Sequence, residues 1–135
     1  DYFQHWLDME HKLEESGHTL PKIFCVNWFR KGDDGKFVWP GYGDNMRVLK
    51  WMLDRLEGQA QGEETMFGIA PQYGEINWTG LTFTPEQFKT VTSIDKAAWA
   101  EEFKSHDAHF ELLSYHMPQE LIDTKAALEQ RLAAL

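Results

Sequence analysis

Apolar side chains recur at helical spacing in two clearly bounded segments of the chain. Over residues 2–16, aromatic and leucine side chains stand among charged ones, which predicts an amphipathic helix that ends at Gly17. Over residues 45–57, apolar residues recur three and four positions apart, Asp44 is placed to cap the N-terminus, and Gly58 is placed to stop the helix. Both segments are therefore predicted to be helices with one apolar face.

The second half of the chain is predicted to be mainly helical. Thr84, Pro85 and Gln87 mark a helix start, because a threonine N-cap, a proline in the first turn and a glutamine three residues after the cap form a capping box. Two further helices are predicted at about 94–115 and 118–134. The last helix carries a leucine stripe made of Leu121, Leu128, Leu132 and Leu135.

Shorter apolar runs between these helices predict strands and turns. Residues 23–29 are β-branched and aromatic and predict a strand, residues 30–36 predict a charged turn, and residues 37–39 predict a return strand. Residues 58–82 hold five of the ten glycines and predict loops with one short strand near 66–70. The whole pattern indicates a mixed α/β (α+β) fold with short strands and about five helices.

Composition and charge exclude several classes of protein. Residues 1–135 are enough for one domain or part of one. The hydrophobic content of 42% and the aromatic content of 14% are typical of a folded chain. No apolar run reaches about 18 residues, so no membrane span is predicted. The net charge of −9 argues against a nucleic-acid partner, whose phosphates require Lys and Arg. It also requires that a phosphate-bearing ligand be neutralised mostly by groups outside this segment.

The N-terminus and the single cysteine bear on the origin of the chain. The sequence opens inside a predicted helix without a starting Met, a basic flank or a small-residue cleavage pattern. We therefore predict no signal peptide and interpret the sequence as a piece of a longer protein. Cys25 excludes an internal disulfide and agrees with a reducing cytoplasm. Because Cys25 lies in an apolar run, it is predicted to be a buried, unreactive thiol.

The densest candidate chemistry lies in residues 27–45, where aromatic side chains are interspersed with glycines and a proline. Phe29, Phe37 and Tyr42 are separated by turn residues, so they cannot easily all face the interior of one hairpin. Glycines on both sides of Tyr42 allow close backbone approach, and Asn45 offers both a donor and an acceptor. This combination suits a planar ligand that stacks on the rings and is read at its edge by the amide. The alternative is that the rings fill a local core.

Other familiar sites are not indicated by the pattern. Residues 41–43 lack the third glycine of a dinucleotide fingerprint, and Gly35-Lys36 is followed by Phe37, where a P-loop requires Ser or Thr. Three histidines lie within 106–116, but zinc normally requires three or four converging ligands, often including Cys, so no metal site is predicted. Adjacent carboxylates diverge on a helix, and no Ser–His–Asp or Cys–His set is discernible. No catalytic residue is therefore predicted.

Two stretches of the chain, residues 21–31 and 35–52, closely resemble the GTP-dependent phosphoenolpyruvate carboxykinases. The core of the match, Phe-Val-Trp-Pro-Gly-Tyr-Gly-Asp-Asn at residues 37–45, is long and rich in rare residues. In that family the matching segment lies near the C-terminus and holds the guanine base. The resemblance implies that the chain is the C-terminal portion of the family's nucleotide-binding domain.

The resemblance also implies which residues bind the nucleotide. Three aromatic rings form the family's guanine pocket, an asparagine hydrogen-bonds the base edge, and the backbone just before that asparagine assists. Tyr42 stands where the family usually has Phe, which keeps the ring and adds a hydroxyl that requires water or a protein partner. The residues that fall on these positions are Phe29, Phe37, Tyr42, Gly43, Asp44 and Asn45.

For the whole enzyme, the resemblance implies reversible conversion of oxaloacetate and GTP into phosphoenolpyruvate, GDP and CO2, a reaction of gluconeogenesis. It implies Mn²⁺ at the active site and Mg²⁺ on the nucleotide, with their ligands and the P-loop upstream of Asp1. The expected partners are therefore a guanine nucleotide and the upstream remainder of the same enzyme, and the chain alone is expected to be inactive. A monomeric cytoplasmic enzyme is expected.

Two alternatives come from other classes of protein. A non-catalytic module would take a Pro-rich peptide or a sugar ring in its aromatic groove, since such grooves also use Trp, Tyr and Pro on hairpins. A helical scaffold without a ligand would use its aromatic rings for stability alone. In the scaffold, replacement of Phe37 or Tyr42 by Ala would alter stability but no binding property.

Overall fold

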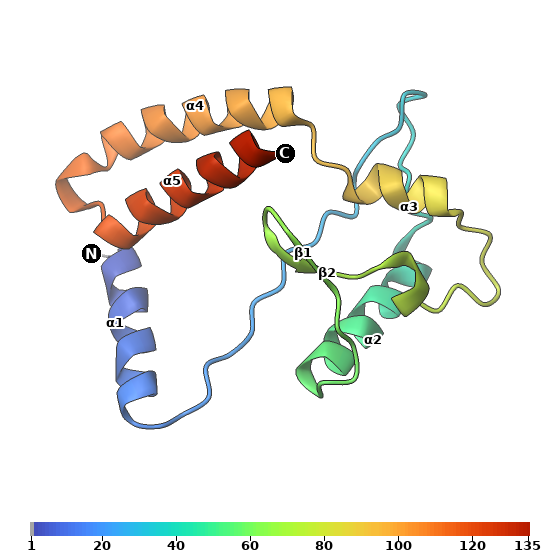
Figure 1. Ribbon diagram of the computed structural model, residues 1–135, viewed down its shortest axis with the longest axis horizontal. Coiled ribbons are helices and arrows are strands. Elements are labelled where there is room, and N and C mark those ends of the chain that lie inside the picture. The colour runs from blue at the N-terminus through green and yellow to red at the C-terminus, as the bar shows by residue number, and fades with distance from the viewer. Residues whose placement is uncertain (1) are drawn as a thin grey trace. The chain divides into compact units, whose positions relative to one another are not determined.

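The computed structural model describes residues 2–135 and divides the chain into two compact units. Unit 1 comprises Asp1–Pro21 together with Ile94–Leu135, and unit 2 comprises Lys22–Ser93. The described residues form five α-helices and a two-stranded sheet (Figure 1). The predicted mixed α/β (α+β) class, with short strands and about five helices, is confirmed.

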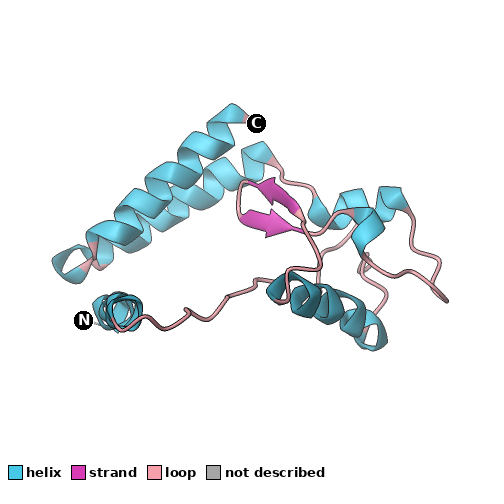
Figure 2. Cartoon of the chain, turned by 60° about the horizontal axis from the view of Figure 1, so that its bottom comes forward, coloured by secondary structure: helices cyan, strands magenta, loops and turns pink. Residues whose placement is uncertain are grey.

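Unit 1 consists of helices and short turns. Its elements are α1 (Tyr2–Glu15), α4 (Lys96–Leu112), the 3-10 turn η3 (Ser114–His116) and α5 (Gln119–Ala134). Helices α4 and α5 run side by side in opposite directions in both views (Figures 1 and 2). Phe103 of α4 and Leu132 of α5 are buried, whereas the terminal Leu135 of the predicted stripe is exposed. The two predicted C-terminal helices are thus confirmed, with α4 ending a few residues early.

Lys125 joins α5 to α4. It is only 9% exposed, its Nζ lies 2.8 Å from Asp107 Oδ1 on α4, and it also pairs with Glu129. The same ammonium lies 5.7 Å from the centre of the Phe103 ring. Burial alone would lower the pKa of Lys125, but the hydrogen bonds to Asp107 and Glu129 outweigh burial and raise it. The lysine therefore stays charged and is paired across the helix contact.

Helix α1 ends as its sequence predicts. Gly17 adopts φ 73°, its N–H donates to Glu14 O at 2.9 Å, and the N–H of His18 donates to Leu13 O at 3.0 Å. These bonds satisfy carbonyls of the last turn that have no partner inside the helix. No residue of α1 is buried, so its apolar side chains contribute little to a core within unit 1.

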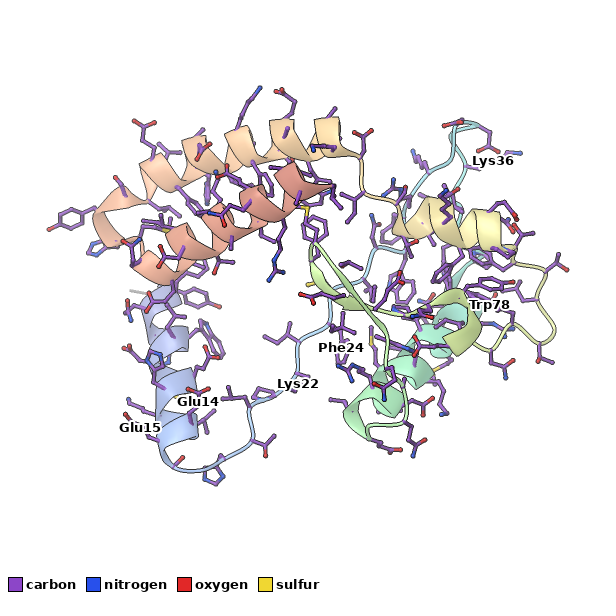
Figure 3. The ribbon with its side chains drawn as sticks, in the orientation of Figure 1. Glu14, Glu15, Lys22, Phe24, Lys36 and Trp78 are labelled. Atoms are coloured by element: carbon purple, nitrogen blue, oxygen red, sulfur yellow. The ribbon has the colours of Figure 1, made fainter. Side chains whose placement is uncertain are left out.

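Unit 2 contains the remaining elements. They are the 3-10 turn η1 (Tyr42–Asp44), α2 (Asn45–Leu56), β1 (Glu63–Thr65), β2 (Gly68–Ala70), the 3-10 turn η2 (Tyr73–Glu75) and α3 (Pro85–Thr92). Its core is a cluster of Trp51, Ala60 and Ile76, against which Phe24 and Trp78 pack. The labelled side chains of Phe24 and Trp78 both belong to this unit (Figure 3). The core thus lies beside α2, the helix that begins at the candidate site.

The predicted start of α3 and the predicted end of α2 are confirmed. At the start of α3, the Thr84 hydroxyl accepts from the Gln87 N–H at 3.2 Å, and the Gln87 side-chain oxygen accepts from the Thr84 N–H at 2.8 Å. At the end of α2, Gly58 adopts φ 74°. Because both ends are specified by local chemistry, a single sequence is enough to locate them.

The predicted strand at residues 23–29 is wrong. This segment is a loop, and the predicted hairpin survives as a single antiparallel bridge between Lys31 and Phe37. The Gly32 N–H donates to Lys36 O at 2.9 Å, which closes the turn, and Lys36 lies near its tip (Figure 3). A strand requires a partner for its ladder, and none of the described residues pairs with this segment. Cys25, predicted to be buried, is accordingly exposed.

A two-stranded hairpin stands where one short strand was predicted. Strands β1 and β2 are antiparallel, with Glu63 opposite Ala70 and Thr65 opposite Gly68. The carboxylate of Glu75 ties the chain before β1 to α2: it accepts from the Gly62 N–H at 2.8 Å and from Trp51 Nε1 at 3.3 Å. The hydrogen bond from Gly62, with others from neighbouring backbone, lowers the pKa of Glu75. Glu75 is therefore ionised, and its carboxylate connects the hairpin to the core through these hydrogen bonds.

Candidate functional site

The aromatic side chains of residues 27–45 divide into an inner and an outer set. Trp39 is 7% exposed, and its ring centre lies 5.5 Å from that of Trp28. Phe29, Phe37 and Tyr42 are instead 71%, 57% and 92% exposed. The local-core interpretation therefore applies to Trp39, whereas the three predicted ligand-stacking rings are open to solvent.

Phe29 and Phe37 are brought together by the turn between them. Their ring centres are 5.7 Å apart at an interplanar angle of 65°, an edge-to-face contact. The Val38 N–H donates to Arg30 O at 2.9 Å, which sets the two sides of the turn against each other. Arg30 also donates through two guanidinium nitrogens to the carbonyl and the hydroxyl of Ser93, each at 2.8 Å. The aromatic pair therefore stands on a turn that is fastened to the end of α3.

Asn45, the first residue of α2, has a side chain held in one orientation. Trp39 Nε1 lies 2.8 Å from Asn45 Oδ1. An indole N–H can only donate, so the asparagine oxygen must face it. The amide NH2 of Asn45 is then the group that remains for a ligand. This orientation was not predicted from the sequence, and it gives the site a donor edge.

Asp44 occupies the predicted N-cap position of α2, but its side chain makes no capping hydrogen bond. The 3-10 turn η1 leaves Asp44 at φ −96° and ψ −3°, outside the extended region that capping residues usually adopt. Its Oδ1 instead accepts from Arg47 Nε at 2.9 Å. Arg47 also donates to the carbonyls of Asn77 and Thr79, the latter at 3.1 Å. Asp44 and Arg47 thus fasten the start of α2 to a neighbouring loop.

Tyr42, Gly43 and Asn45 line one hollow of about 400 Å³. Its remaining walls are apolar and come from the 24–28 loop and α2: Phe24, Val26, Trp28, Met46, Leu49 and Met52. Phe37 lines a separate, charged hollow of about 520 Å³, which also contains Arg30 and Lys31. The structure therefore pairs Phe29 with Phe37 and places Tyr42 beside Asn45. It does not gather all three rings around a single cavity.

Trp39 and Arg47 are the site residues that sequence reasoning missed. Trp39 was assigned only to a return strand, and Arg47 only to a helix. The sequence offered two signals. The indole of Trp39, which can only donate, stands six residues before the amide of Asn45, and the guanidinium of Arg47 stands three residues after the carboxylate of Asp44. Both spacings permit contact, but neither specifies it without the path of the loop.

The metal and membrane predictions concern other parts of the chain. Among residues 2–135, no group of three or more His, Cys, Asp or Glu side chains is arranged to hold a metal ion. His106 of the histidine cluster lies 3.3 Å from Glu102 on its own helix. The described residues therefore contain no group of three such ligands for the Mn²⁺ and Mg²⁺ that the family resemblance implies. None of the helices in this part of the chain is both long and apolar enough to cross a membrane.

Comparisons with known proteins agree on one family. The model of the phosphoenolpyruvate carboxykinase C-terminal P-loop domain matches residues 1–131. The chain is 40% identical over 134 residues to a phosphoenolpyruvate carboxykinase [GTP] of Corynebacterium jeikeium, covering 99% of this chain and 22% of that protein. It is 44% identical over 133 residues to the enzyme of the same name from Anaeromyxobacter sp. strain K, covering 98% of this chain and 22% of the relative.

A third relative, the phosphoenolpyruvate carboxykinase [GTP] of Treponema pallidum strain Nichols, is 42% identical over 133 residues, covering 98% of this chain and 21% of the relative. The chain therefore spans about a fifth of the length of these curated relatives. The family match extends over nearly all of the chain, including the loop that carries Phe37 and Asn45. The chain belongs to the GTP-dependent phosphoenolpyruvate carboxykinase family and corresponds to part of its C-terminal P-loop domain.

Proposed function

We propose that this chain supplies the guanine-binding part of an enzyme that converts oxaloacetate and GTP into phosphoenolpyruvate, GDP and CO2. The proposed nucleotide-binding residues are Phe29, Phe37, Tyr42, Gly43, Asp44 and Asn45. The observation that carries the proposal is the fixed Asn45 amide, whose oxygen accepts from Trp39 Nε1 at 2.8 Å and which lines the same hollow as the solvent-open ring of Tyr42. Family membership supports it, because the named relatives use GTP.

The exposed rings provide stacking surfaces for the base. Stacking of a base on an aromatic side chain is worth about 1–3 kcal/mol and is tolerant of base identity. Phe37 already makes an edge-to-face contact with Phe29, and Lys31 Nζ lies 5.7 Å from the centre of the Phe37 ring. The rings of Phe37 and Tyr42 line different hollows, so enclosure of one base by both requires their loops to approach each other. Stacking therefore supplies affinity without choosing the base.

The Asn45 amide supplies the choice of base. Guanine presents the O6 acceptor where adenine presents the N6 amino donor. With its oxygen turned to Trp39, Asn45 offers NH2 donors, which suit guanine O6 and oppose adenine N6. A donor facing a donor leaves both groups without partners, which costs about 1–3 kcal/mol. The geometry therefore favours guanine over adenine.

The phosphates are proposed to be bound elsewhere in the whole enzyme. The chain carries a net charge of −9, and residues 2–135 present no metal-ligand group. The Mn²⁺ and Mg²⁺ of the family would neutralise the charge of the transferring phosphoryl group, and their ligands are proposed to lie outside these residues. The chain alone is accordingly proposed to bind the base weakly and to form no phosphoenolpyruvate.

A competition experiment tests the proposed function. A fluorescent GDP analogue bound to the chain is expected to be displaced by GTP and hardly by ATP, because guanine presents the O6 acceptor to the Asn45 NH2 where adenine presents the N6 amino donor. A Pro-rich peptide and a simple sugar serve as competitors for the rival groove function. Equal displacement by GTP and ATP, or displacement by the peptide or sugar alone, would contradict guanine binding.

A further inference from the structure

Trp39 joins the interior of unit 2 to the proposed base-reading amide. Its ring is 7% exposed and lies among other aromatic rings, with centre-to-centre distances of 5.5 Å to Trp28, 5.6 Å to Phe83 and 6.3 Å to Trp78. Its single polar atom, Nε1, donates to Asn45 Oδ1 at 2.8 Å. The ring of Trp39 is thus buried, whereas its N–H is held in a fixed position against the side chain of Asn45 in the site.

We infer that Trp39 is a positioning residue that sets the preference for guanine by allowing the Asn45 amide only one orientation. This inference rests on the proposed function, in which Asn45 reads the base. Trp39 does not need to touch the nucleotide. Its effect passes entirely through the amide to which it donates.

The physical reason is the near symmetry of an asparagine side chain. The two ends of a primary amide have almost the same shape, but one accepts and the other donates. Rotation by half a turn would present an oxygen to the ligand, which suits adenine N6 in place of guanine O6. In this protein, the same rotation would turn the Asn45 NH2 against the Trp39 N–H and leave two donors facing each other. Trp39 therefore excludes the orientation that would accept adenine.

The position of Trp39 is itself fixed by a second layer of contacts. Trp78 stacks on Phe83 with ring centres 4.9 Å apart, and its Nε1 donates to Tyr73 O at 2.9 Å. The Tyr73 hydroxyl donates in turn to Phe83 O at 2.7 Å. Because these rings are held by hydrogen bonds as well as by packing, Trp39 cannot readily turn its N–H away from Asn45.

The test replaces the N–H and keeps an aromatic ring. Trp39→Phe is compared with Trp78→Phe, which also removes one indole N–H from the same cluster, but one that donates to the backbone carbonyl of Tyr73. Ligand-observed NMR with millimolar GDP and ADP gives both Kd values for the unmodified chain and each variant. Trp39→Phe is expected to reduce the ADP-to-GDP Kd ratio by about five- to tenfold, the scale of one hydrogen bond. Trp78→Phe is expected to leave the ratio unchanged.

The outcomes separate the inference from the proposed function. If the unmodified chain shows no preference for GDP, the proposed function fails. If it prefers GDP and Trp39→Phe keeps the full ratio, or both variants lose it equally, the positioning role of Trp39 fails.

A measurement on the unmodified chain decides the matter if Trp39→Phe does not fold. The indole N–H resonance of Trp39 is expected to exchange slowly with solvent, both without ligand and with GDP bound, because Asn45 holds it. Exchange as fast as that of a free indole would overturn the inference.

Discussion

Gly62→Ala is expected to destabilise unit 2 by about 2–5 kcal/mol, the sum of strain in a left-handed backbone and overpacking. Gly62 adopts φ +66°, and a Cβ there would lie 2.5 Å from Ile69 Cγ2 and 2.8 Å from Ala70 O. The backbone oxygen of Ala70 cannot move without disrupting the pairing of β1 with β2. The Gly62 N–H would also be displaced from the Glu75 carboxylate that it now approaches to 2.8 Å.

The matched control is Gly58→Ala. Gly58 has a similar φ of +74°, but an added Cβ would have no neighbouring atom within 4 Å. This variant should therefore show the backbone strain alone, about 1–2 kcal/mol. Urea unfolding followed by tryptophan fluorescence measures both. Equal destabilisation by the two substitutions would show that the close approach at Ile69 and Ala70 is not a constraint.

Asn45→Asp is expected to reverse the proposed preference for base. A carboxylate keeps an acceptor for Trp39 Nε1, which now lies 2.8 Å from Asn45 Oδ1, and presents its second oxygen where the amide NH2 was. That oxygen repels guanine O6 and accepts from adenine N6. The ADP-to-GDP Kd ratio should fall by about tenfold or more, because a mismatched base edge costs about 1–3 kcal/mol.

Asn27→Asp serves as the control for added charge. Asn27 lies in the same loop, and its Oδ1 accepts from the Phe29 N–H at 2.9 Å, a bond that a carboxylate preserves. Both variants add one negative charge near the proposed site. This charge should weaken the binding of GDP and of ADP by the same factor, because both nucleotides carry the same phosphates. The Kd ratio should change in Asn45→Asp alone, measured by the same NMR titration with GDP and ADP. A similar change in both variants would assign the effect to charge and remove Asn45 as the reader.

The parts of the fold that could be predicted are those that local chemistry determines. The ends of α1, α2 and α3 follow from Gly17, Gly58 and the Thr84–Gln87 capping box, each of which acts within a few residues. The strand predicted at residues 23–29 failed because pairing depends on a distant partner, which none of the described residues provides. The residues of this segment favour a strand, but they form no ladder of backbone hydrogen bonds with a neighbouring strand in residues 2–135.

The candidate site shows the same division. The identities of the candidate residues, including Phe37 and Asn45, came from ring content, turn chemistry and family resemblance. The orientation of the Asn45 amide did not, because it depends on the burial of Trp39 among rings from residues far along the chain. The exposed position of Cys25 was missed for a related reason: an apolar run is buried only if another element covers it.

The most direct test of guanine recognition follows the Asn45 side chain itself. The ¹⁵N-labelled chain is titrated with GDP and, separately, with ADP, and the resonances of the Asn45 amide NH2 and the Gly43 backbone N–H are recorded. GDP is expected to shift both resonances progressively with concentration, and ADP is expected to leave the Asn45 NH2 unshifted at the same concentrations. Equal shifts with both nucleotides, or GDP-induced shifts confined to residues outside 27–45, would contradict the proposal that this loop reads guanine.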